Sequence, residues 1–233
     1  MDKPPTPHKT TPHYAGHRSR LRERFLKSRG NDLADYELIE LVLFAAMPRR
    51  DVKPIAKALL KRFGSFAGVF NADVGELTKV EGIGEVAAVS LLAVRQAAQR
   101  LLQDDVMDQP VLSNWQSLMD YVRVAMAHGK TEQFRILFLN RKNALMADEL
   151  QQEGTVDHTP VYPREVIKRA LDLGASALIL VHNHPSGDPT PSQADIEMTR
   201  ELQAAGDSLG IRLHDHIVVS KMGNTSFKTL GLL

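Results

Sequence analysis

Two histidines and a downstream aspartate are the side chains in this sequence best suited to chemistry. His182 and His184 follow the apolar run 177–181, which is expected to form a buried strand. Side chains two residues apart on a strand point to the same side, so both imidazoles project together from its end. Asp195 lies in the first turn of a helix expected to begin at Ser192, and its carboxylate can turn back toward them. Two histidines and one carboxylate are typical of a catalytic zinc ion that keeps one position for water.

The same residues also have an explanation that needs no metal. Ser192 and Asp195 match a capping box, in which side chains satisfy the free N–H groups at a helix start. A structural metal site would be expected to have four ligands, usually including cysteine, and this chain has no cysteine. The proline- and glycine-rich segment 185–191 must turn the chain between strand and helix, which favours the metal site.

The pattern formed by the two histidines, Ser192 and Asp195 resembles the signature of the JAMM metalloproteases, also called MPN+. That family has a catalytic glutamate between a helix and the first strand of its domain. Here residues 114–128 are expected to form a helix and residues 134–139 a strand, and Glu132 lies between them. The resemblance therefore implies a catalytic role for Glu132. Taken alone, this residue reads as a charged residue in a surface turn.

The resemblance implies that the chain hydrolyses a peptide or isopeptide bond with water activated by one zinc ion per chain. Such an ion lowers the pKa of its water to about 7 and polarises a carbonyl. Glu132 would take the proton from the water and pass it to the leaving amine. Ser192 would donate a hydrogen bond to the oxyanion, although its hydroxyl is also the expected helix cap.

Further segments resemble the RadC family more specifically. They are the segments 162–165, 182–187 and 215–217, with 35–38 and 48–54 in the N-terminal half. The family name refers to DNA repair and does not itself identify a substrate. The resemblance implies an α/β domain of the MPN type with a mixed sheet, similar to cytidine deaminases in its layers.

A second histidine cluster occurs in the segment 211–219, which is rich in strand formers. On a strand His214 and His216 would share one face, and Asp215 would point the other way. Binding of one metal by all three is therefore not expected. We expect these residues to support neighbouring ligands or the packing of the domain.

The chain divides into two expected domains. Residues 1–17 are expected to form a disordered basic tail, and residues 18–102 a bundle of helices. The acidic segment 103–110 ends in proline and is expected to be a linker. Residues 111–233 are expected to form the metalloprotease-like domain, in the order helix, strand, strand, helix, strand, helix, strand. The predicted fold class is thus an all-α bundle followed by an α/β domain.

Residues 73–92 resemble a helix-hairpin-helix. In that motif the glycines, here Gly82 and Gly84, permit a tight hairpin, and N–H groups of the second helix meet a DNA phosphate. Glu81 and Glu85 would repel phosphate, so a hairpin used only for packing is the alternative.

A basic stripe precedes this hairpin. Lys53, Lys57 and Lys61 repeat every four residues and share one helix face, and Arg49 and Arg50 lie just before it. The stripe is either a solvated face or a surface for nonspecific, salt-dependent contact with DNA. No aromatic residues are interleaved to stack on bases.

The composition of the chain limits which classes of protein it can belong to. The chain has 233 residues, of which 43% are hydrophobic, enough for one or two domains. The lack of cysteine argues against a disulfide framework. We find neither a signal peptide nor an apolar run of about 18 residues, so we expect a cytoplasmic protein without a membrane segment. The first thirty residues carry eight Lys or Arg against two acidic residues and can meet an anionic partner.

Two functions from different classes remain. The first is a zinc-dependent metallopeptidase acting on an unidentified protein or peptide. The alternative is a DNA-binding or DNA-processing protein in which the metal serves a nuclease. Many nucleases use a two-metal centre rich in carboxylates, so the three-ligand set favours the peptidase. A scaffold that keeps the metal only for folding is a third interpretation, against which Glu132 argues.

Overall fold

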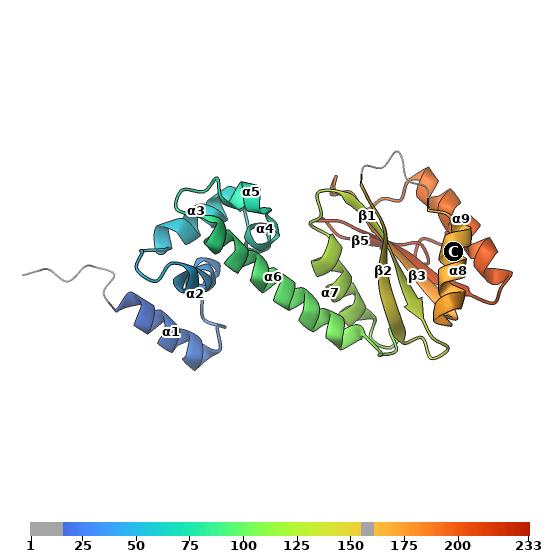
Figure 1. The fold of residues 1–233 in the computed structure, drawn as a ribbon, viewed down its shortest axis with the longest axis horizontal. Coiled ribbons are helices and arrows are strands. Elements are labelled where there is room, and N and C mark those ends of the chain that lie inside the picture. The colour runs from blue at the N-terminus through green and yellow to red at the C-terminus, as the bar shows by residue number, and fades with distance from the viewer. Residues whose placement is uncertain (1–15, 155–160) are drawn as a thin grey trace, which may run out of the picture. The chain divides into compact units, whose positions relative to one another are not determined.

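The computed structural model describes residues 16–154 and 161–233. Contacts divide the chain into two compact units, the first ending at Arg95 and the second beginning at Gln96. We call them the helical unit and the sheet unit (Figure 1). The division lies inside helix α6 (Glu85–Val106), ahead of the expected linker. Val106 is helical and buried in a core of the sheet unit, so the first part of that linker packs with this unit.

The helical unit is built from six helices among the described residues. They are α1 (His17–Ser28), α2 (Asp35–Ala46), α3 (Lys53–Phe63), α4 (Phe66–Asn71), α5 (Val74–Leu77) and the first part of α6. Short connections separate these helices, and two of the connections end in a residue that caps the next helix. Ser65 and Asp73 accept hydrogen bonds from the N–H groups of Gly68 and Glu76, which satisfies donors at the starts of α4 and α5.

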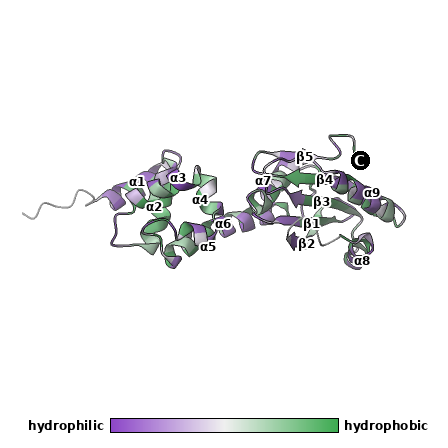
Figure 2. Ribbon diagram, turned by 90° about the horizontal axis from the view of Figure 1, so that it is seen from above, coloured by the Kyte–Doolittle hydropathy of each residue, from purple (hydrophilic) through white to green (hydrophobic). Residues whose placement is uncertain are grey.

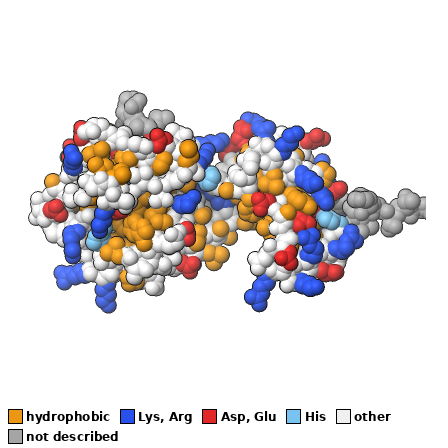
Figure 3. Space-filling view, turned by 180° about the vertical axis from the view of Figure 1, so that it is seen from behind, with side chains coloured by type: hydrophobic (Ala, Val, Ile, Leu, Met, Phe, Trp, Pro, Cys, Tyr) orange, Lys and Arg blue, Asp and Glu red, His pale blue; other side chains and the backbone are white. Residues whose placement is uncertain are grey.

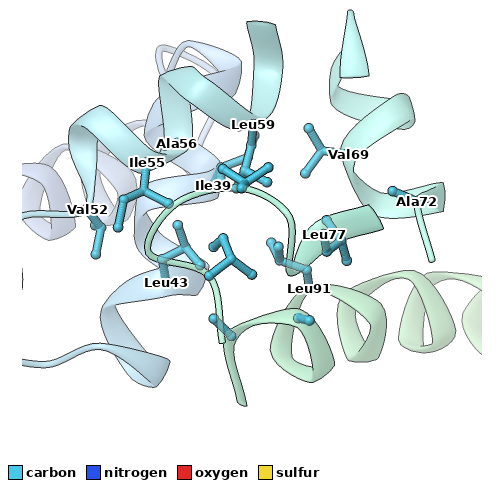
Figure 4. Packing of buried hydrophobic residues seen from close by; sticks show 14 of the residues in the cluster. Ile39, Leu43, Val52, Ile55, Ala56, Leu59, Val69, Ala72, Leu77 and Leu91 are labelled. Carbon is cyan, nitrogen blue, oxygen red and sulfur yellow. The ribbon is translucent and has the colours of Figure 1, made fainter. Parts of the chain in front are cut away.

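The core of the helical unit draws side chains from most of its helices. Ile39 and Leu43 from α2, Leu59 from α3, Leu77 from α5 and Leu91 from α6 are all fully buried and point toward one another (Figure 4). Each such side chain contributes about 1.5–3 kcal/mol through its removal from water. This core explains why the segment expected to form a hairpin is held against α2 and α3.

The basic tail expected over residues 1–17 falls outside the described residues as far as residue 15. His17 is described and begins α1. Its Nε2 atom lies 2.7 Å from Oε2 of Glu40, whose side chain is fully buried. A buried carboxyl group needs a hydrogen-bond partner, so His17 is fixed in the structure by a contact that local sequence composition did not indicate.

The sheet unit contains a mixed sheet, as expected. Its elements are α7 (Trp115–Met126), β1 (Glu132–Leu139), β2 (Leu145–Gly154), α8 (Pro163–Leu173), β3 (Ala177–Asn183), α9 (Gln193–Asp207), β4 (Arg212–Val219) and β5 (Asn224–Ser226). The strand order is β2-β1-β3-β4-β5. β3 and β4 are parallel, and the other neighbouring pairs are antiparallel. β5 was not predicted because three residues are too few to show a strand period.

Helices cover both faces of this sheet (Figure 1). Leu118 and Val122 of α7 pack with Ile179 and Val181 of β3 on one face. α8 and α9 cover the other face and pack against alternate residues of β1 and β3. The central strand β3 is hydrophobic along most of its length because it is buried on both faces, whereas the edge strand β2 is largely hydrophilic (Figure 2).

The crossover from β3 through α9 to β4 sets the position of the candidate site. The carboxyl end of β3 and the amino end of α9 meet beside β1, and ligands of open α/β sheets commonly bind at such strand ends. Within the described parts of the chain, the structure contains no helix with the length and hydrophobicity required to span a membrane.

Candidate metal centre

Four side chains expected to act together meet in the sheet unit. Glu132, His182, His184 and Asp195 each offer one potential ligand atom, and these atoms all lie within 4.8 Å of one another. They come from the start of β1, the end of β3, the turn after it and the start of α9. Such a group can hold a metal ion.

The sheet fixes His182 and the turn fixes His184. His182 is the sixth residue of β3, only 1% exposed, and pairs with Phe134 of β1, whose ring stacks on it at a centroid distance of 6.2 Å. The His184 N–H donates to the carbonyl of Val219 in β4 at 2.9 Å. Gly187, with φ of 99°, then allows the chain to turn toward α9.

The orientation of the His184 ring is determined by the backbone. Its Nδ1 lies 2.8 Å from the carbonyl oxygen of Asp188, which can only accept, so Nδ1 carries the hydrogen. In the neutral ring Nε2 is then unprotonated. It lies 3.0 Å from Nε2 of His182 and 3.7 Å from Oδ2 of Asp195. Oδ1 of Asp195 lies 3.4 Å from Nε2 of His182.

Ser192 forms the expected capping box. Its Oγ accepts from the Asp195 N–H at 3.2 Å, and Oδ2 of Asp195 accepts from the Ser192 N–H at 2.7 Å. The Ser192 hydroxyl also donates to Oδ2 of Asp195 at 2.7 Å. The structure therefore directs this hydroxyl at the carboxylate, and contact with an oxyanion requires the hydroxyl to rotate.

Electrostatics in the cluster favour a positive charge beside Asp195. Burial acts to raise the pKa of Asp195, but contacts with the rings of His182 and His184 outweigh it and hold that pKa well below its usual value. The contact with Asp195 raises the pKa of His184, against the opposing effect of partial burial. Either a proton on His184 or a metal cation supplies the charge that this carboxylate attracts.

Glu132 is the first residue of β1, where sequence reasoning had placed it just before the strand. It lines a pocket of about 520 Å³ together with His184, Ser192 and Asp195. The wall beyond them is partly apolar and includes Phe134 and Met198. The carboxylate thus faces an open space large enough for part of a substrate.

Comparison with known proteins identifies the two halves of the chain. Residues 112–232 match the family model of the RadC-like JAB domain, and residues 15–89 match that of the UPF0758 N-terminal region. A UPF0758 protein from Rhodobacter capsulatus is 60% identical over 213 residues, which cover 91% of this chain and 100% of the relative. The chain belongs to the RadC family. Its JAB domain places it among proteins that are usually metal-dependent hydrolases.

In this RadC-family chain the three residues of the second histidine cluster have different environments and different partners. His216 is fully buried, and its Nε2 lies 2.7 Å from Nδ1 of His182. Burial lowers the pKa of His216 well below its usual value. Asp215 accepts a hydrogen bond from the Ser226 hydroxyl at 2.5 Å and thereby holds β5. His214 contacts Asn143 instead, and it is the residue that the register shift between β3 and β4 leaves unpaired, which explains why strict alternation does not hold there.

Thr199 is a residue to which sequence reasoning gave no role in the site. It is fully buried in α9, one helical turn after Asp195, and its Oγ1 lies 2.6 Å from Nδ1 of His216. Its position four residues after a candidate ligand was the available signal, since such residues share a helix face.

The basic residues predicted for phosphate contact lie in the helical unit. Arg49 and Arg50 line a pocket of about 360 Å³ with Arg18. Gly82, with φ of 92°, lies so close to Arg50 that an added Cβ would be 3.0 Å from its Nη2 atom. The hairpin glycine and one predicted arginine are therefore neighbours. Gly84 has open space around it, on the side where a Cβ would lie.

The lysine stripe is also present as expected on α3. The Nζ atoms of Lys53 and Lys57 lie 5.5 Å and 5.1 Å from the centre of the Tyr36 ring, so both cations interact with the same aromatic ring. Lys61 is exposed further along the helix. Figure 3 shows Lys and Arg side chains over the rear face of the helical unit, with acidic side chains among them.

Proposed function

We propose that this RadC-family chain is a zinc-dependent metallopeptidase of the JAMM type, which hydrolyses a peptide or isopeptide bond. The observation that carries the proposal is the convergence of two imidazole Nε2 atoms and one carboxylate at the end of β3. Two imidazole nitrogens 3.0 Å apart need either a hydrogen or a metal cation between them, because two facing lone pairs repel each other. The open pocket beside them argues for a catalytic site over a structural one.

The spacing of the donor atoms supports zinc. Ligands about 2.0–2.1 Å from a tetrahedral zinc ion lie roughly 3.3 Å from one another. The two imidazole Nε2 atoms lie 3.0 Å apart, Oδ1 of Asp195 lies 3.4 Å from His182 Nε2, and Oδ2 of Asp195 lies 3.7 Å from His184 Nε2, on both sides of that value. His182, His184 and Asp195 would therefore hold the ion.

When bound, the ion would supply Lewis-acid activation of a water molecule and of the substrate carbonyl. Glu132 lies within 4.8 Å of the ligand atoms and faces the pocket, so its carboxylate can accept the proton of that water. The same carboxyl group then protonates the leaving nitrogen. Ser192 can donate a hydrogen bond to the carbonyl oxygen after its hydroxyl rotates away from Asp195.

The experiment is a search for cleavage of a diverse peptide mixture by the zinc-loaded protein, followed by mass spectrometry. Glu132→Gln is expected to keep the metal and to lose cleavage. Glu153→Gln, on the neighbouring strand and exposed, is the matched control and is expected to cleave normally. Equal cleavage by the protein and by Glu132→Gln would contradict the assignment of this glutamate.

A second candidate function is favoured by the position of Arg50 beside Gly82. We infer that residues 73–92 form a helix-hairpin-helix and that this arginine, with Lys53 and Lys57, contacts the DNA backbone without sequence preference. Glu81 and Glu85 flank the hairpin and weaken such contact. This binding could serve the peptidase, or it could serve the alternative function of a metal-dependent nuclease.

Duplex DNA binding measured at several salt concentrations tests this second candidate. Loss of Arg50 in Arg50→Ala is expected to weaken binding and to reduce the slope of log K against log salt by about 1. Arg164→Ala, at an exposed position of the sheet unit, is the control. Equal effects of the two substitutions would contradict a contact at the hairpin. DNA cleavage that disappears in Glu132→Gln would favour the nuclease.

A further inference from the structure

A chain of three hydrogen bonds, of which the two that involve His216 are buried, connects the backbone of α9 to the ring of His182. Thr199 Oγ1 lies 2.5 Å from the carbonyl oxygen of Asp195 and 2.6 Å from Nδ1 of His216. His216 Nε2 lies 2.7 Å from Nδ1 of His182. Thr199 and His216 are fully buried and His182 is 1% exposed, so water does not compete for these groups.

The donor and the acceptor in each of these hydrogen bonds follow from the first one, at the Asp195 carbonyl. The Asp195 carbonyl can only accept, so the Thr199 hydroxyl donates to it. The hydroxyl hydrogen is then used, and Thr199 Oγ1 must accept from Nδ1–H of His216. A neutral His216 with its hydrogen on Nδ1 accepts through Nε2, so Nδ1 of His182 donates to it. In the neutral His182 ring the remaining nitrogen, Nε2, is then unprotonated.

The surroundings of His216 keep this ring neutral and fixed. Phe227 stacks on it at a centroid distance of 4.4 Å, and Phe134 meets it edge-on at 5.7 Å. The Phe227 N–H also donates to the His216 carbonyl at 2.9 Å, which holds the covering ring in place. A charged imidazole enclosed in this way would lack solvation, so the neutral form is favoured.

We propose that Thr199 and His216 are positioning residues that hold His182 in its Nδ1–H tautomer. The unprotonated Nε2 of His182 then faces Nε2 of His184, which the Asp188 carbonyl orients in the same way. Both rings thus present lone pairs to the same point beside Asp195. The tautomer of His182 is a property of the protein alone. Its consequence for metal affinity rests on the proposed function.

The hydrogen bonds begin at Asp195, so α9 contributes to the site in two ways. Asp195 supplies its carboxylate to the cluster and its carbonyl to Thr199, one turn later in α9. Any shift of the first turn of α9 therefore moves a candidate ligand and, through Thr199 and His216, disturbs the second one. Partners of this kind usually change metal affinity by about 10–100-fold when they are removed.

Two variants of Thr199 and one control test the proposal. Thr199→Val removes the hydroxyl at nearly constant volume, and Thr199→Ser restores it. Leu202→Ala changes a buried residue of the same helix and weakens core packing, but it removes none of the three hydrogen bonds. Zinc affinity is measured by competition with a chelator. Imidazole ¹⁵N shifts of the metal-free proteins are measured at a pH well above the usual histidine pKa of about 6.5.

The expected result has two parts. Thr199→Val binds zinc about 10–100-fold more weakly and shows His182 with a changed tautomer, whereas Thr199→Ser and Leu202→Ala resemble the unchanged protein in both readouts. The proposal is overturned if His182 of the unchanged protein carries its hydrogen on Nε2. It is also overturned if Thr199→Val leaves the tautomer unchanged, or if Leu202→Ala weakens zinc binding equally. Absence of zinc binding by the unchanged protein would refute the proposed function, while the tautomer would still decide this inference.

Discussion

Substitution of Ser192 can separate its role as a helix cap from its proposed contact with the oxyanion. Alanine and glycine both remove the hydroxyl, but they differ in how well they are tolerated at the start of a helix. Ser192 Oγ accepts from the Asp195 N–H at 3.2 Å at an exposed helix start. Loss of such a cap in Ser192→Ala costs about 1 kcal/mol, whereas glycine at this position costs only a few tenths. One kcal/mol corresponds to a decrease in Tm of roughly 2–4 °C for a chain of this size.

Activity is expected to follow a different order from stability. If the hydroxyl contacts the oxyanion, Ser192→Ala and Ser192→Gly both lose about 10²–10³-fold in kcat, although the alanine variant loses clearly more stability than the glycine variant. Thermal melts of both variants, followed by peptide cleavage with zinc-loaded protein, measure the two quantities. Full activity in Ser192→Gly would refute the catalytic role and leave Ser192 as a helix cap.

Three further predictions concern contacts outside the proposed ligands. His17→Ala removes the partner of the buried Glu40 carboxylate and is expected to cost about 1–3 kcal/mol in a urea titration that follows the helical unit; an unchanged midpoint would contradict this. Tyr121→Phe removes a donor from the buried Asp148, and a cost of about 1–2 kcal/mol is expected in the same titration of the sheet unit, where no cost would contradict it. Burial lowers the pKa of His214, so the unfolded chain binds that proton more tightly and stability should fall as pH drops below about 6.5. Urea midpoints across this range should decline less in His214→Asn, and an equal decline in both proteins would contradict the assignment.

The parts of the fold that sequence predicted are those with a strong local signal. The apolar run 177–181 predicted β3, and the serine and aspartate at the start of α9 predicted its cap. The proposed ligands could be predicted because they flank these two elements and are close in sequence. The role of Glu132 could be predicted only from the family resemblance. Its neighbours at the site lie about fifty or more residues away in the sequence, and strand pairing brings them together.

The parts that sequence did not predict depend on contacts between distant segments. β5 has three residues and exists because Asp215 and the edge of β4 bind it. The contact between His17 and Glu40 joins α1 to α2, and no local pattern near residue 17 indicates it. The register shift beside His214 likewise arises from the pairing of β3 with β4. In each case the information lies in tertiary packing.

The most direct test of the proposed metal site is the zinc content of the purified protein, measured by mass spectrometry of the native chain. We predict about one zinc ion per chain, and its loss in His184→Ala and Asp195→Asn. Both substitutions remove a proposed ligand at the start of the turn or of α9, and circular dichroism should show that the variants stay folded. A folded protein that takes up no zinc even when zinc is supplied would contradict the account, as would full zinc retention in both variants.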